Sequence, residues 1–326
     1  MLNFCTLFDS NYLAKGLVLV QSLMNACTDF HLYIFAFDEK SFTILTQLNF
    51  KKVTVISLAE FEDEDLLDIK PSRSKAEYCW TSTPSTIFFC LKKYNLDYCT
   101  YIDADLFFYS NPSVLIKEMG GNDVLITEHR YTTKYDQSAL SGKYCVQFMT
   151  FKNSENGLFI LNWWKDACIE WCFNRREDGK FGDQKYLDDW MVRFKGVHEL
   201  KHLGGGVAPW NVQQYKITKE PDGLKVIELS TKSTFDLVFF HFHHLNNQKF
   251  SRINEFYFGP YSITKSTLKK LYKPYIKKLK EMDKFVKSID SGIDGLGSKQ
   301  TVLSTFRLIA HVVKNSIKRN KIIWLR

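Results

Sequence analysis

The stretch Tyr98-Cys-Thr-Tyr-Ile-Asp-Ala-Asp-Leu-Phe-Phe-Tyr109 places two carboxylates at the end of an apolar segment. Residues 98–102 predict a buried strand, and Asp103 and Asp105 follow it directly. Because side chains two apart in extended backbone point to the same side, both carboxylates can grip one hard cation. Oxygen ligands suit Mg²⁺ or Mn²⁺. The alternative is a solvated turn, but burying two unpaired carboxylates would be costly, which favours a metal site.

The segments before this stretch alternate between strand and helix patterns. Residues 2–8, 32–37 and 53–58 predict strands, and apolar residues recur at helical spacing from Leu13 onward. This alternation predicts an α/β fold, with a mainly parallel sheet and helices on both faces. No GxGxxG follows the first strand, which excludes that kind of dinucleotide site. Further strands are expected at 123–127, 145–151 and 237–243, and helices at 84–94 and 157–173.

A second polar segment follows the first predicted strand. Ligands in open α/β sheets bind beyond the carboxyl ends of strands, and Asp9 occupies such an end, as Asp103 and Asp105 do. Asp9, Asn11 and Tyr12 can contact a nucleobase and a ribose, because Asp and Asn match a base edge and Tyr offers a stacking face. The same segment can also cap the helix that follows it. The two roles are compatible.

Three histidines and two basic residues follow the last of these strands. By alternation His241 and His243 share a face, and His244 takes the other. A histidine here can complete the coordination shell that the aspartates begin, and His241 is placed ahead of His243. The alternative is a histidine cluster without metal. Lys249 and Arg252 can meet a phosphate group.

The segment 179–190 combines polar and aromatic side chains. Asp183 with Gln184, and Asp188 with its neighbour Asp189, suit the recognition of sugar hydroxyls among aromatic residues. The alternative is a helix that begins, with a cap, near Asp183.

Four of these segments occur in one order that resembles a known group of enzymes. They are Phe8-Asp-Ser-Asn-Tyr12, Tyr101-Ile-Asp-Ala-Asp-Leu106, Gly182-Asp-Gln-Lys-Tyr-Leu187 and His241-Phe-His-His244. The chain resembles bacterial GT-A glycosyltransferases related to family 8, which includes lipooligosaccharide galactosyltransferases and glycogenin. The resemblance covers about residues 1–250. It implies the GT-A fold, a Rossmann-like nucleotide-diphospho-sugar transferase fold.

The resemblance also implies a role for each matching residue. Asp103, Asp105 and His241 would bind Mn²⁺, or Mg²⁺ in its place. Asp9 and Tyr12 would hold the uridine of a UDP-sugar donor.

The sugar side of the implied site includes both matches and departures. Asp183 and Gln184 would lie by the donor sugar, with Gln184 near the anomeric carbon, and Lys249 would match a diphosphate-binding lysine. The group usually has Asn-x-Gly where this chain has Cys145-Val-Gln147. It also has an arginine where this chain has Thr83-Pro-Ser85, and Ser85 is therefore counted among the expected donor-binding residues. Asp183 is the nearest carboxylate for a nucleophile.

The expected function is metal-dependent transfer of a sugar from a nucleotide diphosphate, and the resemblance implies UDP as the nucleotide and retention of the anomeric configuration. The acceptor would be a glycan or a lipid-linked glycan in surface polysaccharide or glycoconjugate synthesis. One alternative is a sugar-phosphate nucleotidyltransferase, although its Gly-rich basic loop is missing after the first strand. Another is a non-catalytic carbohydrate-binding protein that uses the aromatic residues, which form 15% of the chain.

The net charge of +8 is concentrated near the C-terminus. We therefore expect a catalytic domain over residues 1–250 and a basic helical region over 251–326, in which residues 302–317 have one apolar face. Such helices suit an anionic membrane surface. Nucleic-acid binding is the second interpretation of this charge, although we expect no nucleic-acid partner. The third interpretation is a helix that packs on the catalytic domain.

The eight cysteines form no CxxC pair, and we expect them to be reduced. The N-terminus has no basic or cleavable leader, and no apolar run approaches the ~20 residues that span a bilayer. The expected location is the cytoplasm, peripheral on the inner face of the cell membrane.

Overall fold

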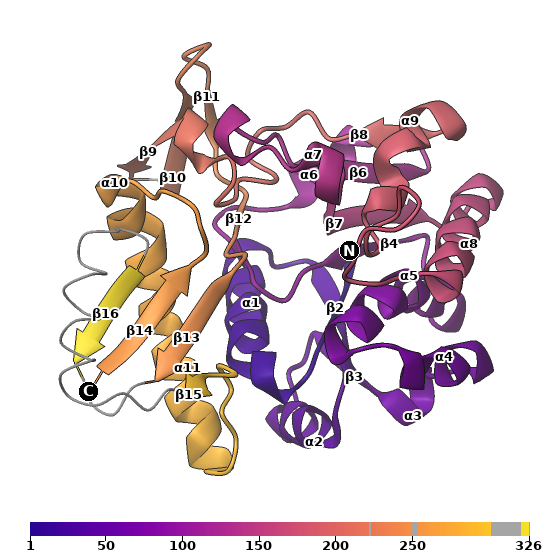
Figure 1. Cartoon of the computed structure of the whole chain (residues 1–326), viewed down its shortest axis with the longest axis horizontal. Helices are drawn as coiled ribbons and strands as arrows, with labels where there is room; N and C mark the ends of the chain where they lie inside the picture. The colour runs from indigo at the N-terminus through magenta and orange to yellow at the C-terminus, as the bar shows by residue number, and fades with distance from the viewer. Residues whose placement is uncertain (222, 250–252, 301–320, 326) are drawn as a thin grey trace.

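The computed structural model describes residues 1–221, 223–249, 253–300 and 321–325 of the chain (Figure 1). A seven-stranded sheet in the order β3-β2-β1-β4-β7-β6-β8 forms its centre, and β7 runs antiparallel to its neighbours while the other six strands are parallel. The strands are β1 (Leu2–Phe8), β2 (Phe30–Ala36), β3 (Val53–Ser57), β4 (Tyr98–Ile102), β6 (Val124–Glu128), β7 (Tyr144–Lys152) and β8 (Val197–Glu199). The predicted mainly parallel sheet is confirmed.

Helices cover both faces of this sheet, as predicted. On β1, Phe4 and Phe8 point into the core beneath α1, whereas Cys5 and Leu7 point into the core beneath α5. The helices are α1 (Leu13–Ala26), α2 (Glu39–Leu48), α3 (Leu58–Phe61), α4 (Glu64–Ile69), α5 (Lys75–Lys93), α6 (Ser113–Glu118), α7 (Ser138–Ser141), α8 (Glu155–Glu170) and α9 (Trp190–Arg193). Short 3-10 helices are η1 (Ser10–Tyr12), η2 (Lys70–Ser72), η3 (Thr133–Tyr135), η4 (Lys185–Asp189) and η5 (Val212–Gln214).

Helix α5 begins nine residues before its predicted start at Pro84, so that prediction is wrong. Ser74 and Glu77 form a capping box, in which Ser74 N–H donates to the Glu77 carboxylate over 2.8 Å. The proline lies inside the helix, and the hydroxyl of Thr83 donates to the carbonyl of Cys79 one turn earlier. Proline is common in the first helical turn, which is why it suggested a helix start.

A two-stranded sheet joins two distant parts of the chain, the segment after Asp105 and the segment that ends at His241. Strand β5 (Leu106–Phe108) pairs antiparallel with β12 (Phe239–His241), and the register sets Leu106 opposite His241. The strand expected at 237–243 is therefore shorter than predicted. Beside it, β9 (Tyr215–Glu220), β10 (Gly223–Glu228) and β11 (Thr234–Asp236) form a three-stranded antiparallel sheet.

The C-terminal part contains strands that the sequence did not predict. Strands β13 (Leu245–Lys249), β14 (Ile253–Phe258), β15 (Lys299–Gln300) and β16 (Lys321–Leu325) form a sheet in the order β15-β13-β14-β16. The helical expectation is wrong for 253–258 and 321–325. Strands β13 and β14 pair with each other although the domain boundary was predicted at residue 250, between them in the sequence. The apolar segment 302–317 and Arg252 lie outside the described residues.

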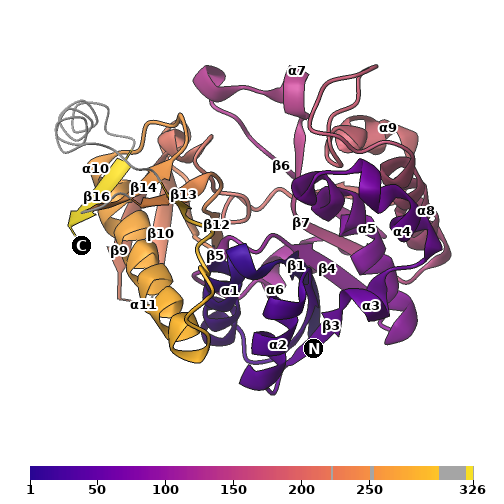
Figure 2. The ribbon, with the colours of Figure 1, turned by 60° about the horizontal axis from the view of Figure 1, so that its bottom comes forward.

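The predicted basic helices are present as α10 (Lys265–Thr267), the π-helix η6 (Leu268–Tyr272) and α11 (Lys273–Ile289). The apolar face of α11, which includes Ile276 and Leu279, packs against Ala14 and Val18 of α1. Figure 2 shows α11 lying alongside α1. Of the three interpretations of the basic C-terminal part, α11 matches the third, a helix that packs on the catalytic domain.

All eight cysteines are free thiols. The sulfur atoms of Cys5, Cys90 and Cys99 meet in the core within 4.8 Å of one another. Burial raises the pKa of Cys90 and Cys99 well above the ordinary value, so both remain neutral thiols. For Cys5, burial is outweighed by hydrogen bonds from Cys90, Cys99 and Thr86, which lower the pKa to about 5. Metal ligation needs thiolates, and we interpret this cluster as core packing. Within the described ranges, no helix has the length and apolar character needed to cross a membrane.

Candidate functional site

The predicted metal ligands converge at the carboxyl end of β4. Asp103 and Asp105 lie between β4 and β5, and the β5–β12 pairing brings His241 beside them. A backbone bond from Phe242 N–H to the Asp105 carbonyl, 3.0 Å long, extends this pairing. The His241 Nε2 atom lies 3.0 Å from Asp105 Oδ1 and 3.6 Å from Asp103 Oδ2.

The donor atoms of these three residues fit a divalent cation. One oxygen from each aspartate and one imidazole nitrogen lie within 4.8 Å of one another. Two oxygen ligands and one nitrogen suit Mn²⁺, and Mg²⁺ less well. His243 is outside this cluster, although its ring lies 5.3 Å from that of His241.

Burial and mutual interaction shift the pKa values of all three residues in the cluster. Burial, with help from Asp105, raises the pKa of Asp103 to about 6. Burial also acts to raise the pKa of Asp105, but His241 and Lys15 outweigh it and hold that pKa below its ordinary range. For His241 burial lowers the pKa, yet the two aspartates raise it overall. A bound cation would replace the protons on Asp103 and His241.

We therefore expect the affinity for Mn²⁺ to rise with pH. Because the pKa of Asp103 and of His241 is raised, both groups keep a proton at pH values where they would ordinarily have lost it, and the proton competes with the metal. Between about pH 5.5 and about pH 8 the dissociation constant should fall by about tenfold or more. Electron paramagnetic resonance of free Mn²⁺ measures this change. An equal affinity at both pH values would contradict the assignment of these ligands.

Asp183 lies next to the metal cluster, in the loop before η4. Burial and then the neighbouring Asp103 raise its pKa to about 8, while its own N–H and that of Gln184 donate to the carboxylate. Its backbone carbonyl accepts a 2.9 Å bond from the Trp164 indole. Gln184 directs its amide N–H to the carbonyl of Ser141 over 2.7 Å. The structure brings the Asp183 carboxylate close to Asp103, whereas the Gln184 amide is bound to the neighbouring loop.

The predicted nucleotide-binding residues form the short helix η1 and its cap. Asp9 accepts bonds from the N–H and the side-chain amide of Asn11, at 3.0 and 2.9 Å, so its capping role is real. The ring of Tyr12 is 42% exposed and available for stacking. Lys15 links this helix to the metal cluster, because its ammonium lies 4.0 Å from the Tyr12 ring centre and 3.8 Å from Asp105 Oδ2.

The other two predicted donor-binding residues lie in different surroundings. Ser85 is buried in α5, and its hydroxyl has no hydrogen-bond partner among the described residues. Lys249 forms a 2.7 Å ion pair with Asp294. The loop that contains Asp294 touches the start of α1, where the Ala14 N–H donates to the Gly295 carbonyl over 2.9 Å.

Sequence reasoning missed two residues that contact the predicted ligands. Lys15 is almost fully buried, and its signal was a lysine on the apolar side of a helix, one turn after Tyr12. Gln147 accepts a 2.8 Å bond from His241 Nδ1 through its side chain and a 3.1 Å bond from Asp103 N–H through its backbone. In the sequence, the only signal for Gln147 was that it stands where the related enzymes have the glycine of Asn-x-Gly.

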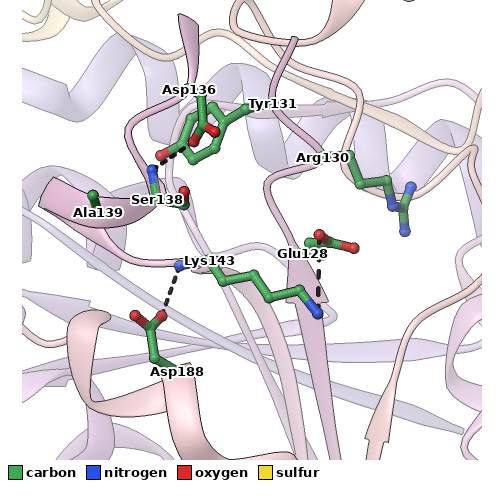
Figure 3. Close-up of a pocket in the computed structure, with 8 residues that line it drawn as sticks. All are labelled: Glu128, Arg130, Tyr131, Asp136, Ser138, Ala139, Lys143 and Asp188. Atoms are coloured by element: carbon green, nitrogen blue, oxygen red, sulfur yellow. Dashed lines mark hydrogen bonds and ion pairs between the residues drawn. The ribbon is translucent and has the colours of Figure 1, made fainter. Parts of the chain in front are cut away.

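A pocket of about 560 Å³ opens beyond Gln184, between β6, α7 and η4 (Figure 3). Figure 3 shows Lys143 between Asp188 and Glu128, and its backbone N–H donates to Asp188 over 2.7 Å. The ring of Tyr131 stacks on His129 at 4.5 Å, and Trp210 links His129 to His241 at centroid distances of 5.0 and 5.4 Å. The pocket is lined by Glu128, Arg130, Tyr131, Asp136, Ser138, Ala139, Lys143 and Asp188.

Comparison with known proteins gives two relatives and one fold. No protein-family model matches the chain. The uncharacterized protein YfnD of Bacillus subtilis (strain 168) is 31% identical over 315 residues, which cover 93% of this chain and 97% of YfnD. YfnF of the same bacterium is 29% identical over 304 residues, covering 91% and 97%.

Among solved structures, the galactosyltransferase LgtC, determined with donor and acceptor sugar analogues, has a TM-score of 0.53 at 12% identity. The match covers 86% of this chain and 96% of LgtC. At this identity the likeness concerns the fold, and the predicted GT-A fold is confirmed.

Proposed function

Because the chain belongs to the family of YfnD and has the GT-A fold of LgtC, we propose that it is a glycosyltransferase. It would use a divalent metal ion and a nucleotide-diphospho-sugar donor. The observation that carries this proposal is the convergence of Asp103, Asp105 and His241 at the carboxyl end of β4. Release of a nucleoside diphosphate from such a donor in the presence of Mn²⁺ tests it.

The residues around the cluster would share the work of holding the donor. When bound, the cation would offset the charge that develops on the leaving diphosphate. Asp103, Asp105 and His241 would hold it in place. The ammonium of Lys15, 3.8 Å from Asp105, is placed to stabilise the same negative charge from the side of α1.

The nucleoside and the sugar would lie on opposite sides of the diphosphate. The exposed ring of Tyr12 offers a stacking face for a base, and Asp9 and Asn11 offer a carboxylate and an amide to its edge. By resemblance the base would be uracil. Asp183, buried beside Asp103, would face the donor sugar, with Gln184 next to it in the chain. The resemblance further implies retention at the anomeric carbon, with Asp183 as the nearest carboxylate.

The pocket beyond Gln184 would take the acceptor. The half-buried ring of Tyr131 gives an apolar platform, and three carboxylates, from Glu128, Asp136 and Asp188, give acceptors for hydroxyl groups. A volume of about 560 Å³ admits a sugar unit of a glycan. We therefore favour a glycan or lipid-linked glycan acceptor.

A Tyr131→Leu variant is expected to separate the two substrates. Loss of the aromatic platform should lower transfer to the acceptor by about 2- to 10-fold, because one stacking contact is worth about 0.5–1.5 kcal/mol. Metal-dependent hydrolysis of the donor without acceptor should stay unchanged. The control is Tyr98→Leu. Tyr98 is the first residue of β4, at the strand end far from the metal cluster, and its hydroxyl donates to the Met1 carbonyl. An equal loss of transfer and hydrolysis in Tyr131→Leu would contradict an acceptor pocket.

Contact with a membrane surface remains a proposal that rests on charge. The apolar face of α11 is used against α1, whereas Lys273, Lys277 and Lys284 are exposed. Binding would therefore be electrostatic and sensitive to salt. Flotation of the full chain with anionic vesicles, and its loss when these three lysines are changed to Ala, would support the proposal; equal flotation with neutral vesicles would oppose it.

A further inference from the structure

Gln147 contacts both an aspartate and the histidine of the metal cluster. It is fully buried in β7, and its backbone carbonyl accepts the Asp103 N–H over 3.1 Å. Its side-chain Oε1 lies 2.8 Å from Nδ1 of His241, which belongs to a strand far along the chain. A single residue therefore contacts one aspartate through the backbone and the histidine through the side chain.

The bond to Gln147 determines which imidazole nitrogen faces the aspartates. An amide oxygen only accepts hydrogen bonds, so Nδ1 of His241 must carry the proton in this contact. In the neutral ring the lone pair then lies on Nε2, which is the atom 3.0 Å from Asp105 and 3.6 Å from Asp103. A metal-binding histidine commonly donates its other N–H to such a partner, which fixes the tautomer and the ring orientation.

We propose that Gln147 is the positioning residue of this site, which holds His241 in the Nδ1–H tautomer with Nε2 directed at the cation. The proposal rests on the metal-dependent function proposed above. Trp210 restricts the same ring from its edge, at 5.4 Å between centroids. Apart from its contacts with the aspartates, the ring of His241 is thus held by the hydrogen bond to Gln147 and by the edge contact with Trp210.

Packing alone does not account for an amide at this position. The Nε2 atom of Gln147 is buried and has no hydrogen-bond partner among the described residues. A leucine would fill a similar volume without burying an unpaired donor. The benefit of the glutamine therefore lies in its oxygen, and the only side-chain hydrogen bond found for Oε1 in the described part of the chain is the one to His241.

The test compares Gln147→Leu with Gln147→Glu in the full chain without donor. The leucine removes the acceptor, and the dissociation constant for Mn²⁺ should increase by about 10- to 100-fold. The glutamate keeps an acceptor for Nδ1–H, so its Mn²⁺ affinity should be retained or increased. The matched control is Gln213→Leu, because Gln213 also has one unpaired amide atom, in a half-buried side chain away from the metal cluster. This control should bind Mn²⁺ as the unmodified protein does.

Histidine ¹⁵N spectra of the unmodified chain give a readout that needs no variant. With Mg²⁺ bound in place of the paramagnetic Mn²⁺, so that Nε2 faces the cation and not a carboxylate alone, they should show His241 as the Nδ1–H tautomer, and Gln147→Leu should show less of it at the same Mg²⁺ concentration. If the unmodified chain binds Mn²⁺ and Gln147→Leu binds it equally well, or if His241 is the Nε2–H tautomer, the role of Gln147 is overturned and the metal site stands. If the unmodified chain binds no Mn²⁺, the proposed metal-dependent function is itself overturned.

Discussion

An Asp103→Ala variant is expected to lose about 10³-fold or more of the metal-dependent transfer activity. Asp103 supplies one of the three donor atoms that lie within 4.8 Å of one another, and its removal leaves two ligands for the cation. A loss of this size corresponds to about 4 kcal/mol of transition-state stabilisation. Asp103 is a better choice than Asp105, because Asp105 is the ion-pair partner of the buried Lys15, whose charge would be left unpaired.

The matched control for this variant is Asp97→Ala. Asp97 is an exposed aspartate immediately before β4, at the strand end opposite to Asp103. Both variants should unfold at temperatures close to that of the unmodified chain, and only Asp103→Ala should lose Mn²⁺ binding and activity. Equal activity of Asp103→Ala and Asp97→Ala would contradict the assignment of Asp103 as a metal ligand.

An Asp183→Asn variant is expected to lose about 10²- to 10³-fold in kcat while its affinity for Mn²⁺ stays within about threefold. The carboxyl group lies close to Asp103 but outside the three-residue cluster, and the backbone N–H groups of Asp183 and Gln184 act to lower its pKa. Asparagine keeps the size and one oxygen, so the loss reports the missing carboxyl group near the donor sugar. It is measured from initial rates at saturating donor and Mn²⁺.

Asp189→Asn is the matched control for this second variant. Asp189 is six residues further along and forms an exposed ion pair with Arg193. An exposed pair of this kind contributes little to stability, so Asp189→Asn should keep its activity. If Asp183→Asn keeps full kcat, Asp183 acts only through its backbone carbonyl, which accepts the indole N–H of Trp164.

The sequence could predict the parts of the site that depend on local pattern. An apolar strand followed by two aspartates is visible in residues 98–105, and β4 ends at Ile102 as predicted. Alternation along residues 241–244 was enough to place His241 and His243 on one face, and the family resemblance named His241 as the ligand candidate. The order of the motifs along the chain was enough to predict the fold.

The contacts that support these ligands depend on strand register, which the sequence does not display. Gln147 meets His241 only because β5 pairs with β12 while β7 pairs with β4. Lys15 reaches Asp105 because α1 packs against β5, the strand that directly follows Asp105. The pocket lined by Tyr131 depends on loops from β6, α7 and η4 that are far apart along the chain.

The C-terminal part shows how composition can hide strands. Its many lysines suggested helices throughout, and this holds for α11, whose apolar residues recur at helical spacing. Strand β14 has the sequence Ile-Asn-Glu-Phe-Tyr-Phe, and its pairing with β13 and β16 decides its structure. Tertiary pairing of this kind commonly overrides local composition.

The most direct test of the proposed function is a panel of nucleotide-diphospho-sugars, UDP-sugars first, incubated with the full chain and Mn²⁺. The measured quantity is the product released. We predict a nucleoside diphosphate from at least one donor, faster with a glycan acceptor than with water alone, and lost on chelation by EDTA or in Asp103→Ala. Formation of pyrophosphate from a nucleoside triphosphate and a sugar phosphate would instead indicate a nucleotidyltransferase. Donor binding without any product would indicate a carbohydrate-binding protein, and either result would contradict a glycosyltransferase.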